Sequence, residues 1–147
     1  MSNFEQIQAI ATPIEVQLRW SDQDINGHIN NVNILMLVEE ARIQATQQWT
    51  QTTPGVDGTR RVTRALNTDF NREVHYGKET IVWVWIVRVG QTSFVFGQLL
   101  EQDGVPCVYA EATMVRLDAD TGKPKPHDEA YRRLLETHVG PAYDPKA

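Results

Sequence analysis

The chain has 147 residues, of which 41% are hydrophobic and 22% are charged, and a chain of this size and composition can build one compact domain with its own core. Its formal net charge of -5 disfavours nonspecific binding to nucleic acid, which needs a positive field over a broad surface. Charged residues, glutamine or glycine interrupt every apolar run, so no segment is long enough to cross a bilayer. We therefore expect no nucleic-acid or membrane partner, and small-molecule chemistry becomes the default.

Cysteine usage and the first residues bear on the compartment. Cys107 is the single cysteine, so no internal disulfide can form, and residues 1–11 lack the charged start and apolar run of a secretory leader. A cytoplasmic protein is expected. We interpret Cys107 as a small core residue, because no basic group adjacent in sequence would activate its thiol.

The N-terminal third of the chain predicts a strand, a loop and a long helix. Residues 1–12 are interpreted as a loose lead-in that ends at Pro13. Strict apolar alternation then predicts a strand over residues 14–20. After a polar turn, apolar residues recur at helical spacing from about Asn30 to Trp49, and the first half of this helix is expected to be buried on all sides. A loop rich in proline and glycine over residues 52–58 ends the helix.

Four further strands are predicted, over residues 60–71, 80–89, 93–101 and 105–117. The strand at 80–89 is apolar at both parities, so both of its faces should be buried. The long helix can cover only one face, and we expect a second subunit to cover the other.

The remaining residues predict a short helix and a loose end. Asp128 is expected to cap a helix that runs through Leu135, and the tail is expected to be frayed. The result is a single α+β domain of residues 1–147 with a core at about 14–135, in which antiparallel strands wrap one long helix.

A polar loop between the first strand and the long helix suggests chemistry. Asp24 lies just before the helix, whose free N–H groups and positive dipole end would point into the same pocket as its carboxylate. This arrangement suits acyl transfer. The chain has no Gly-x-Ser-x-Gly elbow to supply a serine nucleophile, so another group must activate water or attack directly.

The loop also carries a family resemblance. Asp24-Ile25-Asn26-Gly27-His28-Ile29-Asn30-Asn31, followed by Glu39-Glu40-Ala41-Arg42, resembles the hotdog-fold acyl thioesterases of the 4-hydroxybenzoyl-CoA thioesterase type, and also the plant acyl-carrier-protein thioesterases. The likeness extends over residues 14–135. It implies a hotdog fold, in which an antiparallel sheet wraps a central helix, and homodimers joined edge to edge that often form homotetramers. It also implies hydrolysis of acyl thioesters, with Asp24 at the family's acidic catalytic position.

Two departures from the family pattern stand out. Where relatives often have tyrosine after the paired asparagines, this chain has Ile34, and where they often have proline after the second strand it has Glu73. The first change is expected to alter the acyl pocket. Neither departure touches Asp24.

In the resulting hypothesis, the amides from Asn30 to Asn33 bind the thioester carbonyl oxygen. Asp24 either attacks the carbon or takes a proton from water, and the sequence leaves both alternatives open. His28 and Asn31 are assigned to catalysis, as groups that orient the carboxylate or the water. Gly27, Asn30, Val32 and Asn33 are assigned to substrate binding. The structural alternatives are that Asn30 caps the helix and that His28 fixes the loop by bonding a backbone carbonyl.

The sequence also bears on two other kinds of ligand, metal ions and the phosphates of CoA. Asp22, Asp24 and His28 suggest a metal site, but no second group of ligands with suitable spacing follows, so neither a metal nor a cofactor is predicted. An acyl-CoA substrate carries phosphates, which basic side chains could bind. The basic clusters of the chain are Arg60–Arg64, Lys123–Lys125 and Arg132–Arg133, and we assign no cluster to the phosphates. The negative net charge argues against an acidic acyl carrier protein as donor.

Two rival functions remain open. The chain could be a noncatalytic hotdog module that binds an acyl thioester or another apolar ligand, because a fold does not fix a function. A hotdog dehydratase is a third possibility, which the Asp-x-x-Gly-His-x-Asn-Asn arrangement favours less than a thioesterase.

Overall fold

The computed structural model describes residues 2–52 and 60–146, and the predicted loop at 52–58 falls almost entirely outside these ranges. The elements, in chain order, are α1 (Phe4–Gln8), β1 (Thr12–Val16), a 3-10 turn (Trp20–Asp22), α2 (Asn31–Thr50), β2 (Arg60–Phe70), β3 (Thr80–Val89), β4 (Ser93–Gln102), β5 (Val105–Leu117) and α3 (Glu129–Glu136). The predicted long helix and the four later strands are confirmed, with bounds that agree to about one residue. No helix of the described ranges is long and apolar enough to cross a membrane.

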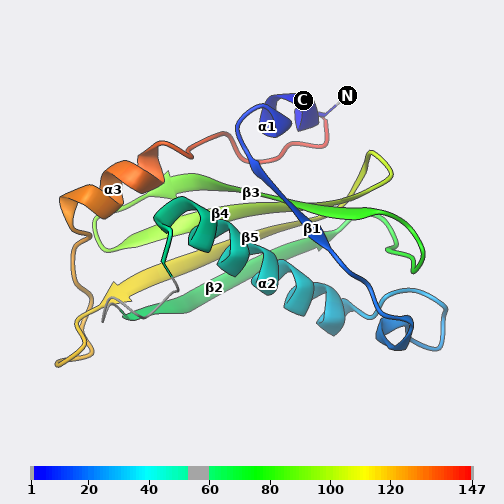
Figure 1. Ribbon diagram of the computed structural model, residues 1–147, viewed down its shortest axis with the longest axis horizontal. Coiled ribbons are helices and arrows are strands. Elements are labelled where there is room, and N and C mark those ends of the chain that lie inside the picture. The colour runs from blue at the N-terminus through cyan, green and yellow to red at the C-terminus, as the bar shows by residue number, and fades with distance from the viewer. Residues whose placement is uncertain (1, 53–59, 147) are drawn as a thin grey trace.

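The five strands form one antiparallel sheet in the order β1-β3-β4-β5-β2, and α2 lies across one face of it (Figure 1). This is the α+β arrangement of one helix and a wrapping sheet that the sequence predicts. The core between α2 and the sheet contains Val82, Val84 and Ile86 of β3 together with Ala110 and Ala112 of β5. Alanine at these positions leaves room for a helix to pack closely, because its side chain ends at Cβ.

The opposite face of the sheet is covered by the two ends of the chain, which lie side by side in Figure 1. Trp85, Leu99 and Tyr109 are buried there against Phe4 and Ile7 of α1. The expectation that a second subunit covers this face is therefore wrong. The apolar residues of β3 predicted that both of its faces are buried. The sequence did not predict what covers the second face, because the five residues of α1 and the irregular tail show no strong pattern.

The ends are also held by hydrogen bonds. The Asn3 amide donates to the Asp144 carbonyl at 3.2 Å and the Gly140 amide to the Ile86 carbonyl at 2.9 Å. The indole N–H of Trp85 donates to the Pro141 carbonyl at 2.9 Å. These contacts do not fit the loose lead-in and frayed tail expected from the sequence.

The first strand and the start of α2 differ from expectation in a way that matters for the site. β1 ends at Val16, and Trp20, expected in the strand, begins the 3-10 turn with 73% of its surface exposed. The start of α2 is not buried on all sides, since Val32 is 64% and Met36 58% exposed.

β2 is the longer of the two edge strands, and it presents apolar side chains that this single chain does not cover. Its outer side pairs with no described strand. Val62, Leu66 and Phe70 are between 37% and 42% exposed. An edge of this length with uncovered apolar groups is a surface on which another chain can pair.

Candidate functional site

The loop before α2 is folded back on itself by its own backbone. The Asp24 amide donates to the His28 carbonyl at 2.8 Å, and the Gly27 amide donates to the Asp24 carbonyl at 3.1 Å. Gly27 has a φ of 77°, a left-handed conformation that favours glycine because it has no Cβ. Gly27 is therefore needed to turn the chain, and its expected role in substrate binding remains a prediction.

Asp24 is half-buried at the inner side of this turn. Its Oδ1 accepts the amide of Asn26 at 2.8 Å and that of His28 at 3.4 Å. Hydrogen bonds of this kind are typical of an Asx turn. For its second oxygen, the structure records no hydrogen bond within the described ranges, so one carboxylate oxygen remains available for chemistry.

The start of α2 offers fewer free amides than the sequence suggested. Asn30 is the N-cap, and its side-chain oxygen accepts the Val32 amide at 2.8 Å. The Asn30 amide itself donates to the Asp22 carbonyl at 2.9 Å, and the first intrahelical bond runs from Ile34 to Asn30 at 3.0 Å. The amides of Asn31 and Asn33 therefore lie before the first turn is closed, and no acceptor for them is recorded in the described part of the chain.

The remaining predicted residues fall into two groups. The side chains of Asn31 and Val32 are exposed at the helix start. The Asn33 amide group donates to the Asp22 carbonyl at 3.1 Å, which ties α2 to the 3-10 turn. The ring of His28 is half-buried, and its Nε2 lies 3.1 Å from a carboxylate oxygen of Glu73. The structural alternative named a backbone carbonyl as the partner of His28, whereas the recorded partner is the side chain of Glu73; the catalytic role of His28 remains a prediction.

Asp22 is the more deeply buried carboxylate of the loop, at 3% exposure. It accepts hydrogen bonds from the backbone amide, Nε and Nη2 of Arg19, at 2.9, 3.2 and 2.9 Å. Burial by itself disfavours the charged form, but the bonds from Arg19 outweigh it, so the pKa of Asp22 lies below its ordinary value. Sequence reasoning named Asp22 only as part of a rejected metal site and missed this role, since the pairing depends on a turn that the alternation pattern concealed.

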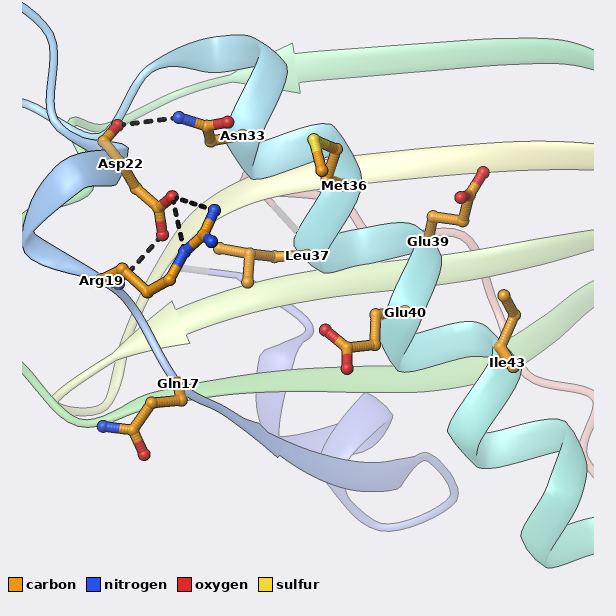
Figure 2. A pocket seen from close by; sticks show the side chains of 9 residues that line it. All are labelled: Gln17, Arg19, Asp22, Asn33, Met36, Leu37, Glu39, Glu40 and Ile43. Carbon is orange, nitrogen blue, oxygen red and sulfur yellow. Dashed lines mark hydrogen bonds and ion pairs between the residues drawn. The ribbon is translucent and has the colours of Figure 1, made fainter.

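A hollow of about 460 Å³ lies beside the loop (Figure 2). Its wall is formed by the 3-10 turn, the chain just after β1 and the outer side of α2: Gln17, Arg19, Asp22, Asn33, Met36, Leu37, Glu39, Glu40 and Ile43. Of the predicted site residues, this wall includes only Asn33. Asp24 and His28 are outside it, so this hollow is not one that the Asp24 carboxylate and the helix amides share.

A second hollow, of about 620 Å³, lies between α2, β2 and α3. Arg42, Phe94 and Phe96 line it, and so does Arg61, whose guanidinium stands 3.8 Å above the centre of the Tyr131 ring. The sequence places Arg61 in one of the basic clusters considered for phosphates and Arg42 in the motif that resembles the thioesterases. It did not place them at a hollow, because the approach of α3 to β2 is a tertiary contact.

Two further observations concern metals and nucleophiles. In residues 2–52 and 60–146, no group of three or more histidine, cysteine, aspartate or glutamate side chains is arranged to hold a metal ion. Cys107 is buried in β5, and burial raises the pKa of its thiol. The interpretation of Cys107 as a core residue is confirmed.

Comparison with known proteins matches residues 18–135 to the family model of the thioesterase-like superfamily. The chain is 30% identical over 125 residues to the uncharacterized protein YsmA of Bacillus subtilis, covering 84% of each chain. Among solved structures, a predicted thioesterase from Bacillus stearothermophilus superposes with a TM-score of 0.81 at 27% identity, over 89% of this chain and 98% of the other. A thioesterase from Thermus thermophilus, complexed with coenzyme A and zinc, superposes with a TM-score of 0.73 at 28% identity, over 84% and 90%.

Proposed function

We propose that this chain, which belongs to the thioesterase-like superfamily, hydrolyses an acyl-CoA thioester to a free acid and CoA. Its fold is the hotdog fold, an antiparallel sheet around one long helix. The observation that carries the proposal is the loop before α2. Within the described residues, one carboxylate oxygen of Asp24 has no recorded hydrogen bond, and the amides of Asn31 and Asn33, close to it in sequence, have no recorded acceptor.

The chemistry follows from what thioester hydrolysis requires. The carbonyl oxygen gains negative charge in the transition state, and the backbone amides of Asn31 and Asn33 are donors that can stabilise it together with the helix dipole. Asp24 acts as general base toward water or as nucleophile toward the carbonyl carbon. His28 and Asn31 complete the site as groups that orient the carboxylate or the water, and Gly27, Asn30, Val32 and Asn33 form the walls around the thioester.

CoA as the thiol is supported by a relative. The Thermus thermophilus thioesterase, 28% identical to this chain, was solved as a complex with coenzyme A. A net charge of -5 also opposes the approach of an acidic carrier protein more than that of a small ligand. The proposal leaves the acyl group open.

The active form is proposed to be a homodimer or homotetramer in the cytoplasm, with the acyl pocket at a subunit interface. Two observations support a partner. β2 is an edge strand with three apolar side chains more than a third exposed, and Val32 and Met36 leave the start of α2 uncovered. Since Asp24 lines neither of the two hollows described above, a second copy placed over this side would supply the missing wall.

The direct test is Asp24→Asn. Asparagine keeps the size and the Oδ1 acceptor of the turn but can neither take a proton nor attack, so kcat should fall by about a hundredfold or more with an unchanged melting temperature. Thiol release from a panel of short, long and aromatic acyl-CoAs measures it. Asp120→Asn, at an exposed turn away from the loop, is the matched control and should turn over like the wild type.

The noncatalytic binding module is the alternative that the same panel separates. Binding of an acyl-CoA without thiol release over hours would favour the module. Equal turnover by the wild type and Asp24→Asn would remove the proposed mechanism while leaving thioesterase activity in place.

A further inference from the structure

The connection between β2 and β3, residues 71–79, lies against the loop before α2. The Ile29 amide donates to the Val74 carbonyl at 2.8 Å, and both side chains are almost completely buried. Two segments more than forty residues apart in the sequence are therefore joined directly beside Asp24.

Side chains extend this junction. A carboxylate oxygen of Glu73 lies 3.1 Å from Nε2 of His28 and 3.5 Å from Nε2 of His75. The two rings stand edge to face, with centroids 5.3 Å apart. Because a carboxylate only accepts, a ring nitrogen bonded to it carries the hydrogen. The oxygen of Glu73 beside the ring thus favours the form of His28 that is protonated at Nε2.

Glu73 is itself placed by a well-anchored stretch of chain. Gln102 is 3% exposed; its side-chain oxygen accepts the His75 amide at 3.0 Å, and its nitrogen donates to the His75 carbonyl at 2.8 Å. That nitrogen also donates to the Thr80 hydroxyl at 2.9 Å. A buried side chain that satisfies both backbone groups of one residue immobilises that residue.

The backbone of His28 is in turn hydrogen-bonded to Asp24. The His28 carbonyl accepts the Asp24 amide, and the His28 amide donates to the Asp24 carboxylate. A rotation of the His28 backbone would move both bonds. The position of the Asp24 carboxylate therefore depends on the backbone of His28, and Glu73 lies 3.1 Å from the ring of that same residue.

We propose that Glu73 is a positioning residue for the hydrolysis: by holding the His28 ring, it keeps the Asp24 loop in its reactive shape. This inference rests on the proposed function of Asp24. Glu73 stands where relatives often have proline, which has no side chain that could accept a hydrogen bond. Its side chain is 61% exposed, and surface pairs of this kind add little to stability, so its effect should appear in turnover rather than in melting.

The test compares three variants. Glu73→Ala should lower kcat about tenfold, because small displacements of a reacting group are costly, while KM stays within about twofold. Glu73→Gln keeps an oxygen that accepts the His28 hydrogen and should recover most of the turnover. Glu79→Ala, exposed in the same connection, is the control and should match the wild type. Wild-type kcat in Glu73→Ala, or equal loss in the alanine and glutamine variants, would overturn the proposal.

A second readout does not need turnover. Long-range ¹H–¹⁵N spectra of the imidazole rings, assigned with His28→Gln, should show His28 protonated at Nε2 in the wild type and in Glu73→Gln. In Glu73→Ala the two neutral forms should mix. An unchanged His28 signal in Glu73→Ala would contradict the role of Glu73. If Asp24→Asn keeps full activity while the His28 signal changes as expected, the proposed role of Asp24 in the hydrolysis fails and the contact between Glu73 and His28 stands.

Discussion

Two carboxylates stand two residues apart in the loop before α2, and their surroundings differ sharply. Asp22 is buried and takes three hydrogen bonds from Arg19, whereas Asp24 is half-buried and its recorded bonds, within the described ranges, come from two backbone amides. A carboxylate saturated by a cation is a poor base, because its charged form is already stabilised. The comparison indicates that Asp22 builds the turn, and it supports the role in hydrolysis that we propose for Asp24.

The same contrast applies to the asparagines that follow. Asn30 and Asn33 are engaged with the backbone of the loop and the 3-10 turn, while the side chain of Asn31 is exposed. Neighbouring polar residues in one motif therefore divide into those that shape the loop and those that can meet a ligand. Three measurements can sharpen or break this division.

The largest expected effect on stability is from Asp22→Ala. This change removes three hydrogen bonds that a buried carboxylate accepts from Arg19, so the free energy of unfolding should fall by about 2 kcal/mol. Urea unfolding measures it, with Asp120→Ala as the exposed control. In the folded protein, kcat should stay within a few-fold of the wild type. A loss of turnover as large as that expected for Asp24→Asn would show that the two carboxylates do not have separate roles.

Asn30→Ala should have a smaller effect. It removes the acceptor for the Val32 amide, and the loss of an N-cap costs about 1 kcal/mol. Chemical denaturation reports this loss. If Asn30 acts only as a cap, KM for the best acyl-CoA should not change; a KM raised several-fold would instead support the substrate contact predicted from the sequence.

The smallest expected effect is the pH dependence that Asp22 contributes. Its pKa is lower in the folded chain than the ordinary value of about 3.9. Its contribution to stability is therefore complete above about pH 4 and is lost as the pH falls toward the folded pKa. The difference in unfolding free energy between the wild type and Asp22→Ala should be constant from pH 7 to 5 and narrow at pH 3.5. A gap that widens at low pH would have the wrong sign for this pairing.

The long helix and the four later strands were predicted well, whereas the strictly alternating strand expected at 14–20 ends at Val16. The strands at 80–89 and 105–117 have the predicted bounds, and α2 begins and ends one residue later than expected. Alternation of period two and helical spacing report which side chains face the core, and this is decided within each element. The caps at Asn30 and Asp128 followed from local chemistry in the same way.

The prediction failed where distant segments meet. Trp85 is covered by α1 and the tail. This was not predicted, because short and irregular segments pack through a few apolar residues that show no periodic pattern in the sequence. The exposure of Val32 and Met36 was not predicted, for a related reason. An apolar residue gives the same sequence pattern whether it is covered by its own chain or by a partner.

By itself, the sequence determined the order of the strands and the long helix along the chain and the position of the Asp24 loop before that helix. It also determined the resemblance to thioesterases. All of these depend on residues that are close together along the chain. Tertiary structure alone decided that both chain ends cover the second face of the sheet and that Glu73 meets His28. The physical reason is that contacts across the fold depend on how whole elements pack, and packing couples residues that are far apart in the sequence.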